Sequence, residues 1–373
     1  MSQTDFGALS ALQRTAWSTK VAKQGRDENF FMSNAFMGAS TSDMNRPIIR
    51  VTELTKDSRG SKAVLPLVTD LTGGGVAGDN VLEGNEEALV ADEQTIQIDQ
   101  LRNGVRSRGR MSEQDTVIRF RVQARDALGF WLADTIDELM FLTIAGRAYT
   151  LNTDGSTRDA SSQLSTLRFA SDVVAASSNR ILYAGSATSE NTLTANDIMK
   201  WDLVIEAKAL AKRKRIKPIR AGGKGYYVLV LSTEQCRDLE KDSDYKALNA
   251  QAMPRGMNNP LFTHAKKVIN DVVIYDHQKV FNTLGLASSS KWGSAGTVDG
   301  AQSFLMGACA AGAAMLGGLD WAESDNTDYK NRPAIATGRI FGLLKPQYKS
   351  RYDSNATEDY GLITMKTAAA ATA

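Results

Sequence analysis

The sequence is poor in the residues that build most metal centres and covalent cross-links. Its 373 residues include only two histidines and two cysteines. Neither Cys236 nor Cys309 has another cysteine or a histidine at metal-ligand spacing, and the two give no disulfide framework. This cysteine usage is typical of a reducing compartment. We therefore predict no metal site, no cofactor and no disulfide scaffold.

Signatures of catalysis are also missing. No serine or cysteine lies in a G-x-S-x-G setting, and no G-x-x-x-x-G-K-[ST] phosphate loop occurs. His264 and His277 lack ligands at metal spacing, although Asp276 adjoins His277. Acidic residues are plentiful, but no pair is distinguished from a solvated face. We predict that the protein is not an enzyme and has no catalytic residues.

Long hydrophobic runs are absent as well. The longest uncharged apolar run, Ser303 to Leu319, has 17 residues that are mostly alanine and glycine. A membrane span needs about 20 strongly apolar residues, so we assign this run to a core and expect no membrane partner. The first residues, MSQTDFGALS, lack the basic and apolar regions of a signal peptide.

The overall charge is close to zero. Lysine and arginine number 44 and the acids 42, for a net charge of +2, whereas a dedicated nucleic-acid binder carries a strongly basic face. The hydrophobic content of 42% and charged content of 23% are ordinary globular values. The length suggests about two domains.

The charges are nevertheless segregated along the chain between Leu71 and Met111. This segment opens with a glycine cluster of Gly73, Gly74, Gly75 and Gly78. An acidic run then comprises Asp79, Glu83, Glu86, Glu87, Asp92, Glu93 and Asp99, and a basic run comprises Arg102, Arg106, Arg108 and Arg110. An isolated two-stranded ribbon is marginal in water. The segment must therefore be held by another part of the chain or by another subunit.

The glycines formally match the dinucleotide fingerprint G-x-G-x-x-G, with Asp99 about 20 residues further on. That fingerprint requires a helix N-terminus after the glycines, where backbone N–H groups bind pyrophosphate. Acids occupy that place here and would repel phosphates. We predict a flexible loop tip and no cofactor site.

A second basic run lies between Lys208 and Lys224 and contains no acid. Its members are Lys208, Lys212, Arg213, Lys214, Arg215, Lys217, Arg220 and Lys224. Three interpretations remain open: contact with DNA phosphates, a solvated helix C-terminus that favours cations, and pairing with the acidic loop of a neighbouring subunit.

Periodicity predicts a long helix from Ser112, which forms a capping box with Asp115, to about Arg147. Its length would be roughly 50 Å. We expect Leu128, Trp131, Ile136 and Leu139 to pack on a sheet that contains Arg339–Leu344 and Gly361–Met365. Residues 1 to about 50 are polar with isolated apolar anchors, which is typical of an arm.

Shorter elements are predicted in the second half of the chain. A helix spans about Ala195 to Arg215, and Pro218 prevents its extension. The run Tyr226–Leu231 predicts a buried strand, followed by a helix capped by Ser232 or Thr233. Val268 to Tyr275 predicts two short strands around Asn270-Asp271.

The wording GVAGDNVLEGNEE…IDQLRNGVR resembles the major capsid proteins of tailed bacteriophages, in the branch that includes the N4-like phages. The resemblance continues, in order, through YYVLVLSTEQCRDLEKD (226–242), NPLFTHAKKVINDVVIYD (259–276), SFLMGACAAGA (303–313), RIFGLLKPQY (339–348) and EDYGLITMKTAA (358–369). One departure follows the NPLFT motif, where the family has small residues and this chain has His264, Ala265, Lys266 and Lys267.

The resemblance implies an α+β Hong Kong 97-type phage capsid fold. It divides the chain into an N-terminal arm (1–54), an extended loop (55–111), a peripheral domain with a spine helix (112–193), an axial domain (194–325) and C-terminal strands returning to the peripheral domain (326–373). In the family the extended loop lies across a neighbouring subunit.

The function implied is a structural subunit that self-assembles, as hexamers and pentamers, into an icosahedral head enclosing DNA. The expected partners are other copies of the chain, packaged double-stranded DNA by non-specific proximity, and portal, scaffolding or decoration proteins. The expected location is the virion, assembled in the host bacterial cytoplasm. An encapsulin-like nanocompartment shell and a soluble enzyme are the alternatives. The candidate inter-subunit contacts are Gly73, Gly74, Gly75, Gly78, Glu83, Glu86, Glu87, Arg102, Arg106, Arg108, Lys212, Arg213 and Arg215.

Overall fold

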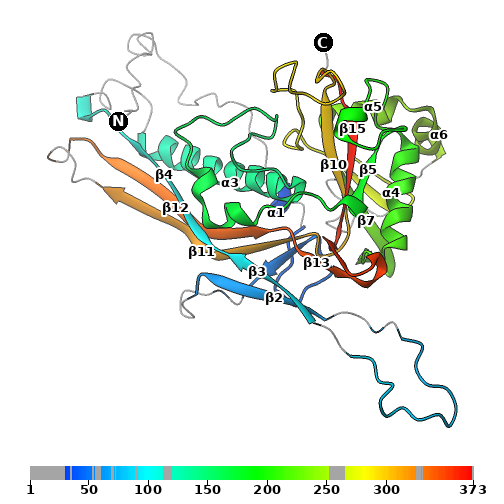
Figure 1. Cartoon of the computed structure of the whole chain (residues 1–373). Coiled ribbons are helices and arrows are strands. Elements are labelled where there is room, and N and C mark those ends of the chain that lie inside the picture. The colour runs from blue at the N-terminus through cyan, green and yellow to red at the C-terminus, as the bar shows by residue number, and fades with distance from the viewer. Residues whose placement is uncertain are drawn as a thin grey trace.

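One long helix connects two separate β-sheets in the computed structural model of the chain (Figure 1). The structure describes residues 30–33, 36–52, 54, 60–68, 71, 73–88, 91–111, 120–251, 265–324, 329 and 331–371. The predicted arm up to residue 29, the capping box at Ser112 and the segment from Asn259 to His264 lie outside these ranges.

The first sheet has four strands in the order β1-β11-β12-β4. Their bounds are Ile48–Val51 (β1), Ala311–Ser324 (β11), Ala334–Leu344 (β12) and Asp99–Arg106 (β4). Strand β1 runs parallel to β11, and the other pairs are antiparallel. The uncharged run from Ser303 lies partly in β11 and is buried there through Met315, as expected of a core segment.

The second sheet has seven strands, in the order β5-β15-β10-β7-β9-β8 with β6 paired to β7. Their bounds are Ile181–Tyr183 (β5), Leu362–Ala368 (β15), Gly300–Met306 (β10), Lys224–Leu231 (β7), Val272–Asp276 (β9), Lys267–Ile269 (β8) and Ile219–Ala221 (β6). Two hairpins complete the strands: β2 (Lys62–Val68) with β3 (Ala91–Gln97), and β13 (Gln347–Ser350) with β14 (Ala356–Asp359).

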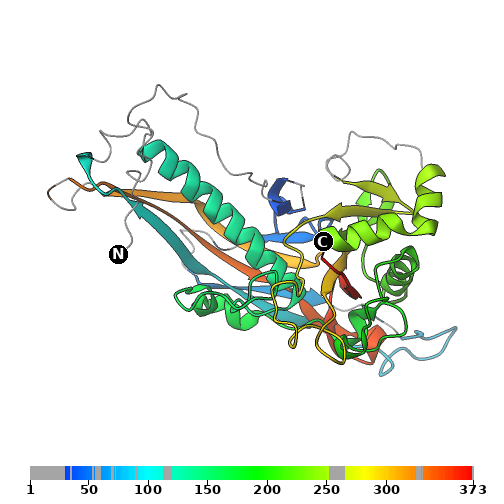
Figure 2. The same cartoon turned by 90° about the horizontal axis from the view of Figure 1, so that it is seen from above.

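Helix α3 (Phe120–Ala145) confirms the predicted spine helix and spans about 39 Å. It lies along one face of the four-stranded sheet, as Figure 2 shows. Its N-terminal half buries one face, and its last seven residues are all buried because the helix ends inside the core. Gly146 terminates it with a φ of +66°, where a Cβ atom would lie 2.4 Å from the Val174 carbonyl oxygen.

The other α-helices among the described residues are α1 (Phe30–Ser33), α4 (Trp201–Arg213), α5 (Thr233–Lys241) and α6 (Ser243–Gln251). Helix α4 is shorter than predicted, because the Asp242 carboxylate accepts the backbone N–H of Trp201 and fixes its start there. Ser232 caps α5 as predicted, in a capping box with Gln235. Asn270 and Asp271 form the predicted turn between β8 and β9, both with positive φ.

One expectation about the sheets is wrong. Arg339–Leu344 and Leu362–Met365 lie in different sheets, because β15 pairs with β10 and β5 of the seven-stranded sheet. Asp99–Arg106, which the predicted extended loop (55–111) includes, pairs with β12 of its own chain in the four-stranded sheet.

A continuous hydrophobic core joins the two sheets. Its centre is aromatic: Phe141 of α3 lies between Phe30 and Phe304, with ring centroids 5.5 and 6.0 Å away. A second core lies between the other face of the seven-stranded sheet and helices α4 and α5. Among the described helices, none has the length and hydropathy to cross a membrane.

Candidate assembly site

The acidic segment forms a loop that projects from the molecule. Strands β2 and β3 pair from Lys62 opposite Gln97 to Val68 opposite Ala91. Beyond them, the described residues between 71 and 88 form neither helix nor strand and extend away from both sheets (Figure 1). The structure therefore presents the predicted loop, with its tip separate from the body of the subunit.

The glycines serve the backbone of this loop. Gly75, Gly78 and Gly84 have φ between +64° and +88°, which disfavours other residues. Gly73 allows a close approach instead, since a Cβ atom there would lie 2.7 Å from Oε2 of Glu87. No helix follows the cluster within the described residues 73–88, so the dinucleotide fingerprint lacks its phosphate-binding element.

The loop combines exposed acids with exposed aliphatic side chains. Asp79, Glu83 and Glu86 are exposed, and the carboxylate of Glu86 accepts the backbone N–H of Gly84 at 2.7 Å. The side chains of Val81 and Leu82 are 68% and 58% exposed. Neighbouring apolar side chains on a projecting loop, rimmed by acids, are typical of a surface that another protein covers.

The base of the loop is attached to the hairpin β13–β14. The Glu87 carboxylate forms an ion pair with Arg351, and its other oxygen accepts the Gly73 backbone N–H at 2.5 Å. The backbone N–H of Lys349 donates to the Asp92 carboxylate at 2.9 Å, and the Tyr348 hydroxyl donates to the Leu65 carbonyl at 3.1 Å. Glu87, named above as an inter-subunit contact, is therefore engaged by its own chain.

The arginines that follow the loop lie along β4 toward the far end of the four-stranded sheet, with Arg102 midway along the strand and Arg106 at its end. Arg102 and Arg106 of β4 are opposite Gly338 and Ala334 of β12, and Arg108 follows the strand. Arg102 and Arg108 are exposed and Arg106 is half-buried. Figure 1 places this end of the sheet and the acidic loop at opposite ends of the molecule. We call these three arginines the arginine end.

The second basic run is divided by the fold. Lys208 is buried and contacts Asp271 at 3.2 Å, and Lys214 forms an ion pair with Asp353. Lys212, Arg213 and Arg215 are exposed around the C-terminal end of α4, where the helix dipole favours cations. Helix α4 lies at the same end of the molecule as the acidic loop (Figure 1). The structure thus separates the candidate contacts into three groups.

A buried ionic cluster lies beneath the hairpin β13–β14. Asp353 contacts Arg180 at 2.8 Å as well as Lys214, and Lys345 contacts Asp359 at 3.2 Å. Burial alone would raise the pKa of Asp353, but hydrogen bonds from Lys214 and Ser350 and the charge of Arg180 outweigh it and hold the pKa below its usual value. Burial lowers the pKa of Lys345, although Asp359 opposes this. Sequence patterns gave no sign of this cluster.

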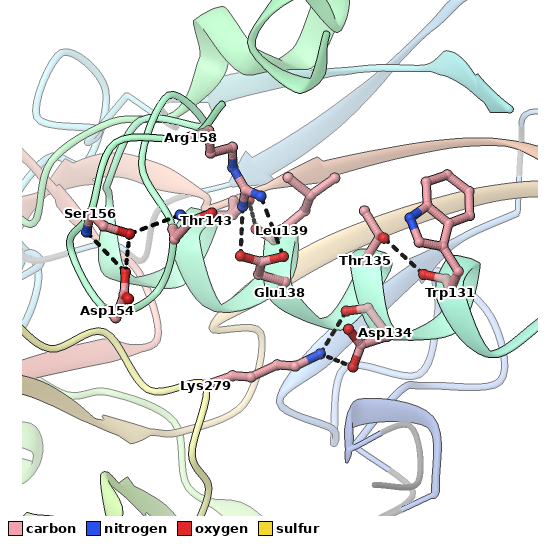
Figure 3. Close-up of polar contacts among 11 residues, drawn as sticks. Trp131, Asp134, Thr135, Glu138, Leu139, Thr143, Asp154, Ser156, Arg158 and Lys279 are labelled. Carbon is pink, nitrogen blue, oxygen red and sulfur yellow. Dashed lines mark hydrogen bonds and ion pairs between the residues drawn. The ribbon is translucent and has the colours of Figure 1, made fainter. Parts of the chain in front are cut away.

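Two ion pairs fix helix α3 from opposite sides, as Figure 3 shows. Arg158 contacts Glu138 at 2.7 Å from the loop after the helix, and Lys279 pairs with Asp134 from the segment after β9. The hydroxyls of Thr135 and Thr143 donate to the carbonyls of Trp131 and Leu139, four residues earlier. Helix α3, which packs on β12 and β4 of the four-stranded sheet and contacts β10 of the seven-stranded sheet, is therefore held by ion pairs on two sides.

The chemistry-bearing residues are packed into the core. Cys236 and Cys309 are buried free thiols, and burial raises the pKa of each to about 11. The ring of His277 stacks on Phe141 at 4.9 Å. In the part of the chain that the structure describes, no group of three or more histidine, cysteine or acidic residues is placed to hold a metal ion.

Comparisons with known proteins point in one direction. A model of the phage capsid protein family matches residues 5–371. The major capsid protein of Pseudomonas phage KPP25 is 40% identical over 376 residues, which covers 98% of both chains. The capsid of Ralstonia phage GP4 is similar over 100% of this chain and 99% of its own, with a TM-score of 0.81 and 28% identity. The capsid of cyanophage Pam1 has a TM-score of 0.71 at 20% identity, over 99% of this chain and 100% of its own, and shows the shared fold.

Proposed function

The chain belongs to the phage capsid protein family, and from that premise we propose how its copies contact one another. It is a structural subunit of the head shell of a tailed phage, with the Hong Kong 97-type capsid fold. The fold and function expected from the resemblance are thereby confirmed, and the nanocompartment alternative is set aside. Its relatives are structural capsid proteins, and we propose that the chain has no catalytic activity.

We propose that the copies form hexamers and pentamers through head-to-tail contacts. The observation that supports this is the position of the acidic loop and the arginine end at opposite ends of one subunit (Figure 1). Different patches of identical chains meet in a head-to-tail contact, and such contacts close into rings. A projecting loop can reach the far end of the next subunit, whereas α4 lies near the loop in its own chain.

The proposed contact joins Glu83 and Glu86 of one subunit to Arg102 and Arg108 of the next. Charge complementarity of this kind steers association and fixes register more than it supplies affinity. Val81 and Leu82 would supply apolar burial beside the charges, at about 25 cal/mol per Å² of area removed from water. Lys212, Arg213 and Arg215 are the second candidate surface for the loop.

We propose domain roles for the two sheets and the loop. The β2–β3 hairpin with the residues beyond it is the extended loop, and the four-stranded sheet with α3 is the peripheral domain. The seven-stranded sheet with α4, α5 and α6 is the axial domain. We propose that β15, contrary to the division expected from sequence, belongs to the axial domain, because all its pairings are with strands of that sheet.

The shell would enclose double-stranded DNA, with contacts that need no base readout. The wording of the acidic loop supports membership of the branch that includes the N4-like phages. Assembly in the host bacterial cytoplasm is consistent with two buried free cysteines. Portal, scaffolding or decoration proteins are further proposed partners.

Charge reversal tests the proposed contact. Glu83→Lys with Glu86→Lys should block shell formation, as seen by size-exclusion chromatography and electron microscopy, without changing the melting temperature of the subunit. Adding Arg102→Glu with Arg108→Glu to the same chain should restore shells. The matched control adds Lys212→Glu with Arg213→Glu instead, and it should not restore them.

Rescue by the Lys212 and Arg213 reversals alone would move the contact to the end of α4. Normal shells from the first double variant at low salt would remove the loop charges from assembly altogether. A purified parent protein that forms only small oligomers and no shells would overturn the proposed self-assembly itself.

A further inference from the structure

The direction in which the acidic loop leaves the subunit depends on what holds the β2–β3 ribbon that carries it. The loop continues from β2 and β3, and a two-stranded ribbon is free to bend at its base unless other elements hold it. Leu65 and Ile96 of this ribbon pack against residues of the four-stranded sheet, and the Gln97 side chain donates to the Asp172 carboxylate at 3.1 Å. Nearer the loop, Asp92 and Glu87 contact the hairpin β13–β14, more than 240 residues later in the sequence.

The central contact is the ion pair between Glu87 and Arg351. Only 27% of the Glu87 side chain and 18% of the Arg351 side chain are exposed, so water screens the pair less than a surface pair. The same carboxylate accepts the backbone N–H of Gly73 on the opposite side of the loop. Glu87 thus joins the two ends of the loop, at Gly73 and at Glu87 itself. The same side chain also attaches the base of the loop to Arg351.

Arg351 is itself fixed through its neighbours. It begins the short 3-10 turn Arg351–Asp353, and the side chain of Asp353 is 1% exposed between Arg180 and Lys214, the C-cap residue of α4. The hydroxyl of Ser350 donates to the same carboxylate at 2.9 Å. Because Asp353 is two residues from Arg351, its ion pairs with Arg180, directly before β5, and with Lys214, directly after α4, fix the backbone from which the Arg351 side chain extends.

We propose that Arg351 is a positioning residue for shell assembly, which acts through Glu87 to fix the angle of the acidic loop relative to the axial domain. The positioning is a property of the single subunit. Its consequence for the shell rests on the proposed function, because only a loop that reaches the next subunit needs a fixed angle.

The test measures the loop angle directly in the unassembled subunit. Spin labels are attached to cysteines introduced at Ala77 on the loop and Lys241 at the end of α5, both exposed. The native Cys236 and Cys309 are buried and react poorly, since the thiolate is the nucleophile. Pulsed electron–electron double resonance spectroscopy then gives the distribution of distances between the two spin labels.

The parent should give one narrow distance distribution. Glu87→Gln and Arg351→Gln should each broaden this distribution by about twofold. The double variant should be no broader than either single variant, because the two substitutions remove the same ion pair. Glu86→Gln is the matched control: it makes the same change one residue away, outside the ion pair, and should leave the distribution narrow.

Widths that add in the double variant, or an unchanged width in Arg351→Gln, would overturn the proposal. If Arg351→Gln folds poorly, Glu87→Gln still tests the proposal, because it breaks the same ion pair by a change in the projecting loop. Electron microscopy of the same variants reports the consequence: Arg351→Gln should give shells of mixed size or incomplete closure. If a variant with a broadened distance distribution formed uniform shells like those of the parent, Arg351 would still position the loop, but this positioning would have no role in assembly.

Discussion

The ammonium of Lys345 lies 3.2 Å from the Asp359 carboxylate, and neither side chain has any exposed surface. Lys345 follows the last strand of the four-stranded sheet, and Asp359 precedes β15 of the seven-stranded sheet. The pair therefore lies where the chain crosses from one sheet to the other, beside the ion pairs of Asp353. A charge that loses its partner in such a site is costly, so each of the two residues stabilises the junction only while the other is present.

Loss of Lys345 should be strongly destabilising. Lys345→Met leaves the buried Asp359 carboxylate without its cation and should lower the free energy of unfolding by about 3–5 kcal/mol. Adding Asp359→Asn removes the unpaired charge and should recover more than half of the loss. Urea denaturation of the unassembled subunit measures both, and an unchanged stability in Lys345→Met would contradict the assignment.

Asp353 should make the subunit sensitive to acid. Its pKa is held below the ordinary value in the folded state, so the ionised group stabilises the fold above the unfolded pKa of about 3.9. That stabilisation is lost as the pH falls through the folded pKa. Asp353→Asn should be less stable than the parent at pH 7, and the difference should shrink below about pH 4. Thermal denaturation of both proteins from pH 7 to pH 2 measures this difference. A difference in stability between variant and parent that stayed constant over this range would contradict the prediction.

Asp137 should act in the opposite direction. Burial raises its pKa to about 6, against the hydrogen bond from the Phe30 backbone and the charge of Lys279. A raised carboxyl pKa favours the protonated form in the fold. As the pH rises from about 4 to about 6, this group therefore lowers the free energy of unfolding by about 3 kcal/mol. Asp137→Asn should lack this slope and be at least as stable as the parent at pH 7. The same pH slope in the variant would contradict the prediction.

Helix α3 distinguishes two of its residues that sequence periodicity treats alike. Leu139 is fully buried, whereas Trp131 is only half-buried. Leu139→Ala should cost about 2–5 kcal/mol through lost burial and a cavity, and Trp131→Ala should cost less than the 3–5 kcal/mol typical of a fully buried tryptophan. Melting temperatures of the two variants order them, and a larger loss in Trp131→Ala would be inconsistent with the packing.

Local signals were predicted well from the sequence. The cap at Ser232, the turn at Asn270-Asp271 and the uncharged core run each depend on a few neighbouring residues, and the structure confirms all three. The acidic loop was also recognisable, because its glycines and acids are contiguous.

Long-range pairing was not predictable in the same way. Strand β15 pairs with β10, about 60 residues earlier, and its buried run would fit either sheet. Strand β4 pairs with β12, and its polar residues resemble the loop before it. The Glu87–Arg351 pair joins residues 264 positions apart, and nothing near either residue indicates the other.

Deletion of the acidic loop tests the account most directly. A chain in which residues 74–86 are replaced by two glycines keeps Gly73, Glu87 and the hairpin β2–β3. Electron microscopy of this protein, with its melting temperature measured in parallel, should show subunits as stable as the parent and no closed shells. Closed shells of normal size, or a chain that no longer folds, would contradict the assignment of this loop to contact between subunits.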